Sequence, residues 1–252
     1  MKIGAHCVLF REKIASETAE VLSAIEKAGF AGFEMGMRFF AMEDGNKIFD
    51  AVKRSNIELF GLHVGTSFPE FVENKEAVTE RLLNAAKFLE DMPNKNIIMS
   101  SAKFDECDNV KAAKSLNDIA KSCAEKAVKI HYHNHAGEFE NNMEVFKIMW
   151  ENAPVLNYGL DLGWAYVGGG EPLDIVKQYG SRISYVHLRD AKSRSREGFV
   201  DLGEGVIDFP ALMGALQELL GNDGWALVEY EDGPQDIQRY VKARKFLKGL
   251  GY

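Results

Sequence analysis

Residues 128–135 read VKIHYHNH, and this stretch decides the fold class. Its β-branched, aromatic and apolar residues predict a buried strand, and the amphipathic residues 143–151 that follow predict a helix. A strand followed by a longer helix is the unit that a parallel sheet requires, because parallel strands need a long crossover connection. How often this unit recurs along the chain therefore determines the fold.

The strand-then-helix unit recurs eight times. The other seven strands are expected at residues 2–7, 32–35, 58–64, 96–100, 156–161, 183–188 and 225–230. The other helices are expected at residues 16–27, 46–54, 69–91, 109–126, 172–179, 209–220 and 235–247. Eight units in 252 residues leave about 31 residues for each, which suits a βα repeat. The sequence thus predicts an α/β protein with one domain, residues 1–252, folded as a (β/α)8 TIM barrel.

An open, doubly wound sheet is the alternative fold. Such sheets have fewer strands, and no GxGxxG phosphate-binding pattern follows the first expected strand. The triplet Gly168–Gly169–Gly170 does not supply one, because it precedes Glu171 and Pro172 instead of following a strand. The closed barrel is therefore preferred.

Composition excludes several classes of protein. Hydrophobic residues make up 46% of the chain and charged residues 27%, as in an ordinary globular protein. The chain contains no run of about 18 apolar residues, so no membrane-spanning helix is predicted. The net charge of −8 argues against nucleic acid as the main partner. Three cysteines without CxxC spacing, and an N-terminus unlike a signal peptide, predict a cytoplasmic protein. The sequence does not decide whether the protein forms a homo-oligomer.

Titratable residues concentrate in the expected strands. All six histidines fall there: His6, His63, His131, His133, His135 and His187. In a barrel, the carboxyl ends of the strands carry the chemistry. Asp161, His187 and Glu229 lie at or near the ends of strands six, seven and eight, and such a mixed oxygen and nitrogen set suits Mn²⁺, Mg²⁺, Co²⁺ or Zn²⁺. The competing interpretation is three separate buried polar residues, and convergence at one level of the barrel argues against it.

The fifth strand should contribute a further ligand. His131, His133 and His135 share one face of an extended strand because side chains alternate with a period of two. His131, the deepest, is expected to hydrogen-bond to neighbouring strands instead. Glu138 and Glu140 follow the strand directly, so the sequence leaves the ligand open between a histidine and a carboxylate.

Several motifs resemble the sugar phosphate isomerase/epimerase family, which is similar in fold to xylose isomerase. They are AGFAGFEM at 28–35, LFGLHVG at 59–65, YHNHAGEFE at 132–140, DLGW at 161–164, VHLRD at 186–190, LGEGVIDF at 202–209 and LVEYE at 227–231. These motifs span essentially the whole chain. They are specific for the fold and the metal site, and they say little about the substrate.

The resemblance implies one divalent metal ion held by Asp161, His187 and Glu229 together with a residue from the fifth strand. Epimerases of the family carry a glutamate inside that strand, and His133 stands in its place here. Glu138 is the nearest carboxylate, as in members with the HNHxxEF pattern. We therefore expect Glu138 to be the fourth ligand, which leaves His133 free to act as a base. The alternative is that His133 itself is the ligand.

The expected activity is that of a metal-dependent sugar isomerase or epimerase. The ion would polarise the carbonyl of a small ketose, keto-sugar or sugar phosphate, and a base would move a proton through an enediolate. His133, His135 and Glu229 are the catalytic candidates. Dehydration of an inosose or 3-keto-sugar starts from the same enediolate and is the alternative reaction.

Carbohydrate binding is assigned to residues on the loops. Lys192 and Arg194 lie in the cationic segment 190–196 and would bind a phosphate or carboxylate, unless that segment is only a solvated loop. Trp164 would stack on a sugar ring, and His63 would line the opposite rim. Two rival functions are a nuclease with the same barrel, which the acidic charge disfavours, and a non-catalytic sugar-binding barrel, which the full ligand set disfavours.

Overall fold

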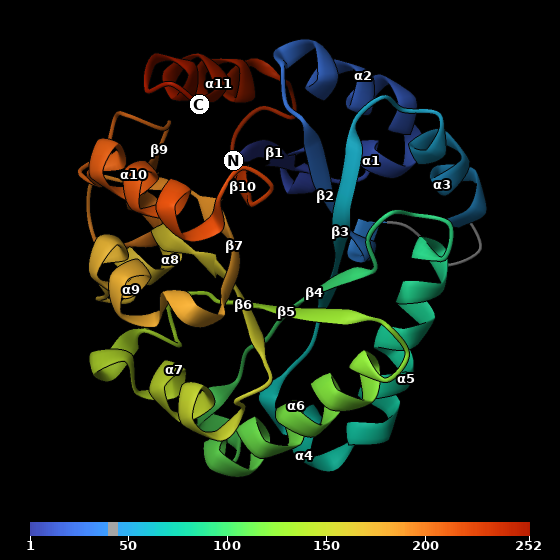
Figure 1. The fold of residues 1–252 in the computed structure, drawn as a ribbon, viewed down its shortest axis with the longest axis vertical. Helices are drawn as coiled ribbons and strands as arrows, with labels where there is room; N and C mark the ends of the chain where they lie inside the picture. Colours follow the sequence, from blue (N-terminus) through green and yellow to red (C-terminus); the bar gives the residue numbers. More distant parts are fainter. Residues whose placement is uncertain (40–44) are drawn as a thin grey trace.

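The computed structural model describes residues 1–39 and 45–252, which form a closed parallel barrel surrounded by helices (Figure 1). Going round the barrel, the strands follow the order β1-β10-β7-β6-β5-β4-β3-β2. Their bounds are β1 Lys2–His6, β2 Gly32–Gly36, β3 Glu58–Gly65, β4 Asn96–Ser100, β5 Lys129–His133, β6 Asn157–Asp161, β7 Ile183–Leu188 and β10 Trp225–Val228. The predicted (β/α)8 barrel is confirmed.

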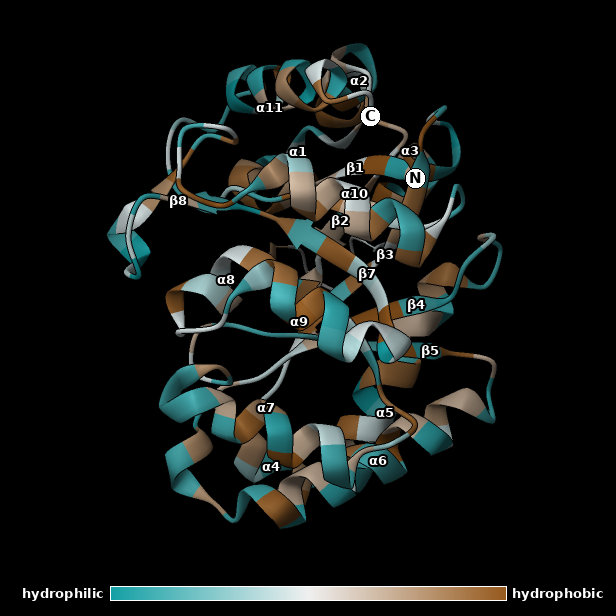
Figure 2. Cartoon of the chain, turned by 60° about the vertical axis from the view of Figure 1, so that its left-hand side comes forward, coloured by the Kyte–Doolittle hydropathy of each residue, from teal (hydrophilic) through white to brown (hydrophobic). Residues whose placement is uncertain are grey.

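Helices follow the barrel strands and form the outer layer, where their hydrophilic and hydrophobic residues alternate along each helix (Figure 2). The α-helices are α1 Lys13–Ser16, α2 Thr18–Ala28, α3 Gly45–Lys53, α4 Phe68–Glu73, α5 Lys75–Ala86, α6 Asn109–Ala124, α7 Glu140–Asn152, α8 Leu162–Val167, α9 Pro172–Tyr179, α10 Phe209–Leu220 and α11 Gln238–Gly249. Short 3-10 turns are η1 Cys7–Phe10, η2 Met37–Phe39, η4 Lys87–Leu89, η5 Phe104–Glu106, η6 Gly180–Arg182 and η7 Arg196–Gly198. No helix of the described residues is long and apolar enough to cross a membrane.

The prediction of one continuous helix over residues 69–91 is wrong. The structure has α4 and α5 in its place, separated by Asn74, whose φ of −138° and ψ of 38° lie outside the helical region. Amphipathic periodicity on both sides of Asn74 hides this break, because the period says nothing about one non-helical residue.

Two further differences from the expected elements affect the site. β5 ends at His133, so His135 lies in the loop after the strand and not within it. The segment after β7 is not only a solvated loop: β8 (Asp190–Ala191) pairs antiparallel with β9 (Phe199–Val200). The Asp190 carboxylate accepts hydrogen bonds from the backbone N–H groups of Gly203 and Gly205, at 3.0 and 2.9 Å, and thereby fixes the end of the hairpin.

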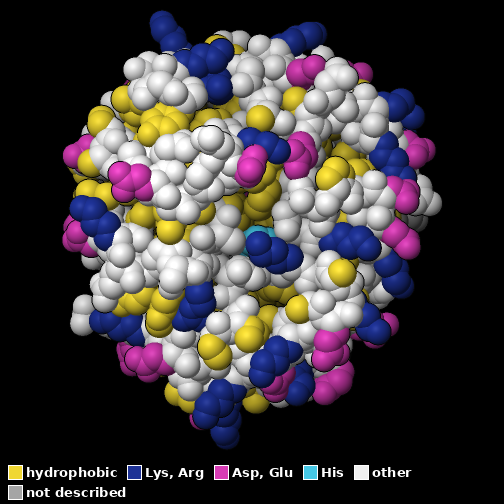
Figure 3. All heavy atoms as spheres, in the orientation of Figure 1, with side chains coloured by type: hydrophobic (Ala, Val, Ile, Leu, Met, Phe, Trp, Pro, Cys, Tyr) yellow, Lys and Arg dark blue, Asp and Glu magenta, His cyan; other side chains and the backbone are white. Residues whose placement is uncertain are grey.

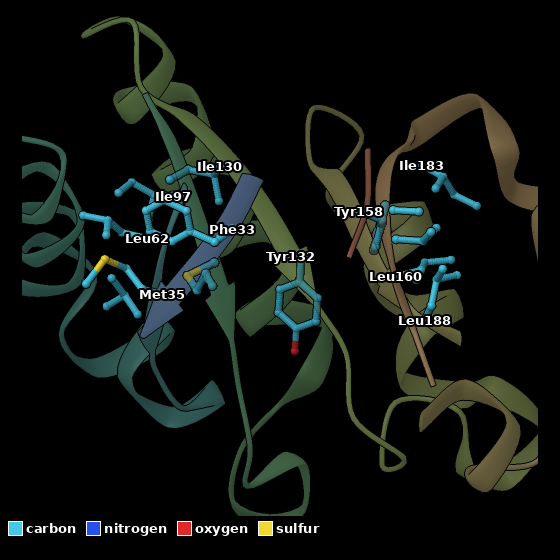
Figure 4. Packing of buried hydrophobic residues seen from close by; sticks show 14 of the residues in the cluster. Phe33, Met35, Leu62, Ile97, Ile130, Tyr132, Tyr158, Leu160, Ile183 and Leu188 are labelled. Carbon is cyan, nitrogen blue, oxygen red and sulfur yellow. The ribbon is translucent and has the colours of Figure 1, made fainter. Parts of the chain in front are cut away.

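Two hydrophobic clusters hold the barrel together. The larger one lies between the strands and the helices, as Figure 4 shows for ten labelled residues. The smaller one fills the barrel interior with Phe60, Ile98, Tyr185, Trp225 and Leu227. These large side chains need glycine opposite them: a Cβ on Gly32 would lie 2.5 Å from the Trp225 ring. The interior is thus a packed core and not a pore.

Candidate functional site

A ring of polar side chains closes the barrel interior at the carboxyl end of the strands. Each barrel strand contributes one residue from its last three positions or directly after its end, in chain order His6, Glu34, His63, Ser100, His133, Asp161, His187 and Glu229. Strand register places neighbours side by side, for example His6 beside Glu34, Ser100 beside His133, and Asp161 beside His187. The apolar layer of the smaller cluster lies below this ring.

Four members of the ring could hold a metal ion. His133, Asp161, His187 and Glu229 each offer one ligand atom, and the four atoms lie within 4.8 Å of one another. All four side chains are buried. The structure therefore brings together Asp161, His187 and Glu229, as the sequence predicted, and adds His133 as the fourth member.

The hydrogen bonding of these four residues is incomplete. His133 Nδ1, Asp161 Oδ2, His187 Nδ1 and Glu229 Oε2 are buried and have no hydrogen-bond partner. His187 Nδ1 and Glu229 Oε2 touch as an ion pair, but without the geometry of a hydrogen bond. Buried polar atoms without a partner are unfavourable, and one such atom on each of four converging residues matches what a divalent ion needs.

Local structure explains the position of Asp161. It ends β6 and is the N-cap of α8, where its Oδ1 accepts a hydrogen bond from the Trp164 N–H at 2.6 Å. The amide of Asn134 bonds to both backbone groups of Asp161, each at 3.0 Å, and so joins the end of β5 to β6. The cap consumes one carboxylate oxygen and leaves Oδ2 directed at the group of four.

Glu138, the expected fourth ligand, is not brought to this group. Its two oxygens accept hydrogen bonds from the Tyr132 hydroxyl at 2.9 Å and the His135 N–H at 3.0 Å. Tyr132 alternates with His133 along β5 and packs in the core between strands and helices, so Glu138 lies outside the barrel interior. We therefore revise the expected ligand: the geometry favours His133.

Burial and charge set the ionisation of the site. Burial raises the pKa of Asp161 to about 7, although Arg189 opposes this. Burial would also raise the pKa of Glu229, but His6 and His187 hold it well below its usual range. For His187, burial acts to lower the pKa, and the carboxylates of Glu34 and Glu229 outweigh it and raise the pKa. An ionised Glu229 thus lies beside a His187 whose pKa is raised, whereas the pKa of Asp161 lies close to neutrality.

Arg189 is a site residue that the sequence analysis did not single out, although it belongs to the VHLRD motif. Its guanidinium is buried, lies 3.9 Å from the Phe199 ring centre and donates to Glu231 at 2.8 Å. The same nitrogen lies 3.5 Å from a Glu229 oxygen and 3.8 Å from an Asp161 oxygen. Arg189 therefore balances the negative charge of two candidate ligands.

Glu34 lies in β2 within the AGFAGFEM motif, and the sequence analysis gave it no role. It is fully buried, and its carboxylate contacts His6, His63 and His187 at 3.0, 3.2 and 2.9 Å. It also accepts a hydrogen bond from the Tyr185 hydroxyl at 3.2 Å. These four side chains come from β1, β3 and β7, and only the closed barrel brings β7 to a carboxylate of β2.

A cavity of about 150 Å³ opens above the ring. Its lining includes His63, His133, His135 and Glu229, together with Arg38 of η2. In the space-filling view, histidine surface appears at one small spot near the centre of the face (Figure 3), in keeping with the burial of most histidine side chains. A small polar molecule in this cavity would touch His133 and Glu229 of the group of four and the imidazoles of His6, His63 and His135.

The other expected carbohydrate-binding residues do not line this cavity. Arg194 donates to the carbonyl oxygens of Tyr166 and Gly170 and pairs with Glu171, while Lys192 is exposed. Trp164 is buried and reaches the site only indirectly, with its ring against that of His135 at 5.7 Å. Of the four residues, the structure places only His63 at the cavity wall.

Comparison with known proteins gives consistent findings at the level of sequence families. The profile described as xylose isomerase-like TIM barrel matches residues 22–250. A protein of Clostridium beijerinckii named inosose dehydratase is 28% identical, covering 91% of this chain and 88% of that protein. A second inosose dehydratase, from Bacillus cereus, is also 28% identical with the same coverage.

Solved structures agree on the fold. A sugar phosphate isomerase/epimerase from Parabacteroides distasonis has a TM-score of 0.77 at 18% identity, covering 98% of this chain and 93% of that one. The probable 3-DHS dehydratase AsbF from Bacillus anthracis has a TM-score of 0.74 at 17% identity, covering 98% and 99%. At this identity the likeness concerns the fold.

Proposed function

This chain belongs to the xylose isomerase-like TIM barrel family, and from that premise we propose that it is a divalent-metal-dependent dehydratase of a small polyhydroxylated ketone such as an inosose. The family resemblance found in the sequence is thereby confirmed. The observation that carries the proposal is the set of four unpaired, buried ligand atoms. The relatives named inosose dehydratase favour the alternative reaction over the isomerisation that we expected first.

We assign the metal to His133, Asp161, His187 and Glu229. Metal ligands are deprotonated, so in the bound state two carboxylates and two neutral imidazoles would form a set of charge −2, which a divalent cation neutralises. A bound ion supplies Lewis acidity beside the substrate carbonyl, which makes a hydrogen on the adjacent carbon more acidic. His133 and Glu229, expected as proton carriers, are then occupied as ligands.

Proton transfer falls to His135. It lines the cavity, and burial lowers its pKa to about 4, so its ring is neutral at pH 7 and can accept a proton. In a dehydration, this proton comes from the carbon beside the carbonyl, a carbon–carbon double bond forms, and hydroxide leaves the next carbon. The protonated imidazole of His135 then returns its proton to the leaving hydroxide, which departs as water.

His63 stands beside the same cavity. Its Nε2 lies 2.8 Å from the Ser100 hydroxyl, and burial lowers the pKa of His63 against the opposing effect of Glu34. Two neutral imidazoles, one from β3 and one from the loop after β5, could transfer protons at two positions of one substrate. This arrangement supports the second candidate function, an isomerase or epimerase, in which the proton returns to carbon instead of leaving with oxygen.

A substrate screen in deuterated water separates these functions. Inososes, ketoses and their phosphates are incubated with Mn²⁺- or Co²⁺-loaded protein, and the products are analysed by mass spectrometry. Loss of one water from an inosose supports the dehydratase. A product of unchanged composition that contains deuterium supports the isomerase or epimerase. Sugar binding without turnover or metal would instead indicate the non-catalytic barrel.

A further inference from the structure

Glu34 is the buried charged group for which the proposed function has no use. Its Oε2 contacts His187 Nε2 at 2.9 Å and the Tyr185 hydroxyl at 3.2 Å. Its Oε1 contacts His6 Nε2 at 3.0 Å and His63 Nδ1 at 3.2 Å. One carboxylate thus receives four side chains from β1, β3 and β7, and an ionised acceptor with several donors is a rigid arrangement.

His6, Glu34 and His63 lie close enough to ligate a second metal ion, but the tautomer of His6 argues against this. His6 Nδ1 accepts a hydrogen bond from the Val8 N–H at 3.1 Å. The lone pair on Nδ1 is therefore used, and in the neutral ring the proton is on Nε2, the atom that faces Glu34. His6 Nε2 contacts Glu34 at 3.0 Å without the geometry of a hydrogen bond, and a ring nitrogen that carries a proton cannot ligate a metal ion.

The same reasoning orients His187. Its Nε2 faces Glu34, whereas its Nδ1 is the buried, unpaired atom beside Glu229 in the group of four. A metal-bound histidine usually donates its other ring N–H to a carboxylate, which fixes both the tautomer and the ring orientation. Glu34 occupies the position of that carboxylate.

The other oxygen of Glu34 orients His63. Since Nδ1 of His63 faces Glu34, its Nε2 is directed at Ser100, and both His63 and Ser100 line the cavity. Backbone structure supports the placement of Glu34: the register between β2 and β3 shifts between Phe33 and Glu34, which pairs Glu34 with Gly61. Irregularities of this kind change the direction of a side chain and occur next to active sites.

We propose that Glu34 is a positioning residue that orients two histidines at once: His187 with Nδ1 directed at the group of four, and His63 with Nε2 directed at Ser100 on the cavity wall. The part concerning His187 rests on the proposed function, because it assumes that the group of four binds a metal. Glu34 itself is not a ligand. It acts through the rings that it holds.

The test compares Glu34→Gln with a matched control, Glu58→Gln. Glu58 begins β3 at the other end of the barrel, where it pairs with Lys2, so its substitution should not change metal binding. Metal-free proteins are titrated with Zn²⁺ by calorimetry. Glu34→Gln should bind Zn²⁺ roughly 10- to 100-fold more weakly than the wild type, the usual effect of removing such a partner. Unchanged affinity would overturn the proposal.

A second measurement does not depend on metal binding. In ¹⁵N-labelled wild type, the Nε2–H proton of His187 should give a slowly exchanging NMR signal with and without Zn²⁺, and Glu34→Gln should lose it. If Glu34→Gln does not fold, the wild-type signal decides, and its absence would overturn the proposal. If the wild type shows the signal but binds no Zn²⁺, the metal function fails and the orientation of His187 by Glu34 stands.

Discussion

His131 and His133 are two residues apart in β5, on the same side of the strand, yet their surroundings differ. His131 lies in the apolar layer, where Nδ1 bonds to the Ser184 hydroxyl at 2.6 Å and Nε2 to Asn96 Oδ1 at 3.1 Å. His133 lies one layer higher, with Nδ1 unpaired among the rings of His63, His135 and His187. As expected, His131 hydrogen-bonds to other strands, although only Asn96 is on a neighbouring strand, β4, and Ser184 is on β7, two strands away.

The difference shows how one strand serves two purposes. An unpaired buried polar atom costs about 1–3 kcal/mol, so a layer with several of them is less stable than it could be. The layer of His131 is complete and supports the barrel. The layer of His133 keeps ligand atoms free, and we infer that stability is given up there for binding.

Removing a ligand from the upper layer should give the largest effect. Asp161→Asn replaces an anionic ligand with a neutral amide, which hard cations bind weakly. We expect loss of bound metal and a fall in kcat of roughly 10²–10⁴-fold, because Lewis acidity supplies several kcal/mol. Metal analysis and turnover of an inosose measure this. Exhaustive chelation of the wild type should reproduce the loss, and Mn²⁺ or Co²⁺ should reverse it.

Exchanging glutamine for each histidine of β5 tests the comparison directly. His133→Gln should weaken metal binding by at least about 10-fold while the fold remains stable, since it removes a proposed ligand. His131→Gln should leave metal binding unchanged and lower the free energy of unfolding by about 1–3 kcal/mol, because Ser184 and Asn96 lose a partner. The opposite pattern in urea unfolding and metal titration would refute the two-layer interpretation.

Glu138→Gln tests the ligand that the structure revises. Because both Glu138 oxygens are bound by Tyr132 and His135, we expect metal content to remain. Loss of metal in this variant would return Glu138 to the ligand set and contradict the assignment of His133.

The same variant should change the pH dependence of stability. Burial raises the pKa of Glu138 to about 8 in the folded protein, above the usual value of 4.5, so the folded state binds more protons between these pH values. The contribution of this group is complete below about pH 4.5 and is lost as the pH rises through about 8, with a slope of up to about 1.4 kcal/mol per pH unit. Unfolding of Glu138→Gln should lack this slope.

The smallest effect is expected at Arg194, on the outer loop. Its guanidinium bonds to Tyr166, Gly170 and Glu171 and does not line the cavity, so Arg194→Ala should leave KM unchanged. Unfolding free energy should fall by less than about 1 kcal/mol, as for most exposed ion pairs. A large rise in KM would restore the substrate contact that the sequence suggested.

The sequence by itself determined the fold and predicted three of the four residues in the candidate metal group. Eight apolar runs alternating with amphipathic segments permit few structures besides a closed barrel. The period of two places His131 and His133 on one face, and strand ends place Asp161, His187 and Glu229 at one level. These inferences succeed because they depend on local periodicity and on the direction of parallel strands.

Only the tertiary structure decided which side chains meet. Glu138 is bound to Tyr132 on the helix side of β5 because the loop after the strand turns it away, and no periodicity describes a loop. Glu34 reaches His6, His63 and His187 only because the barrel closes and the register of β2 shifts. Arg189 follows β7, which lies between β6 and β10, and it reaches Asp161 and Glu229 through the pairing of these neighbouring strands. Contacts between distant strands depend on register and closure, which local sequence does not encode.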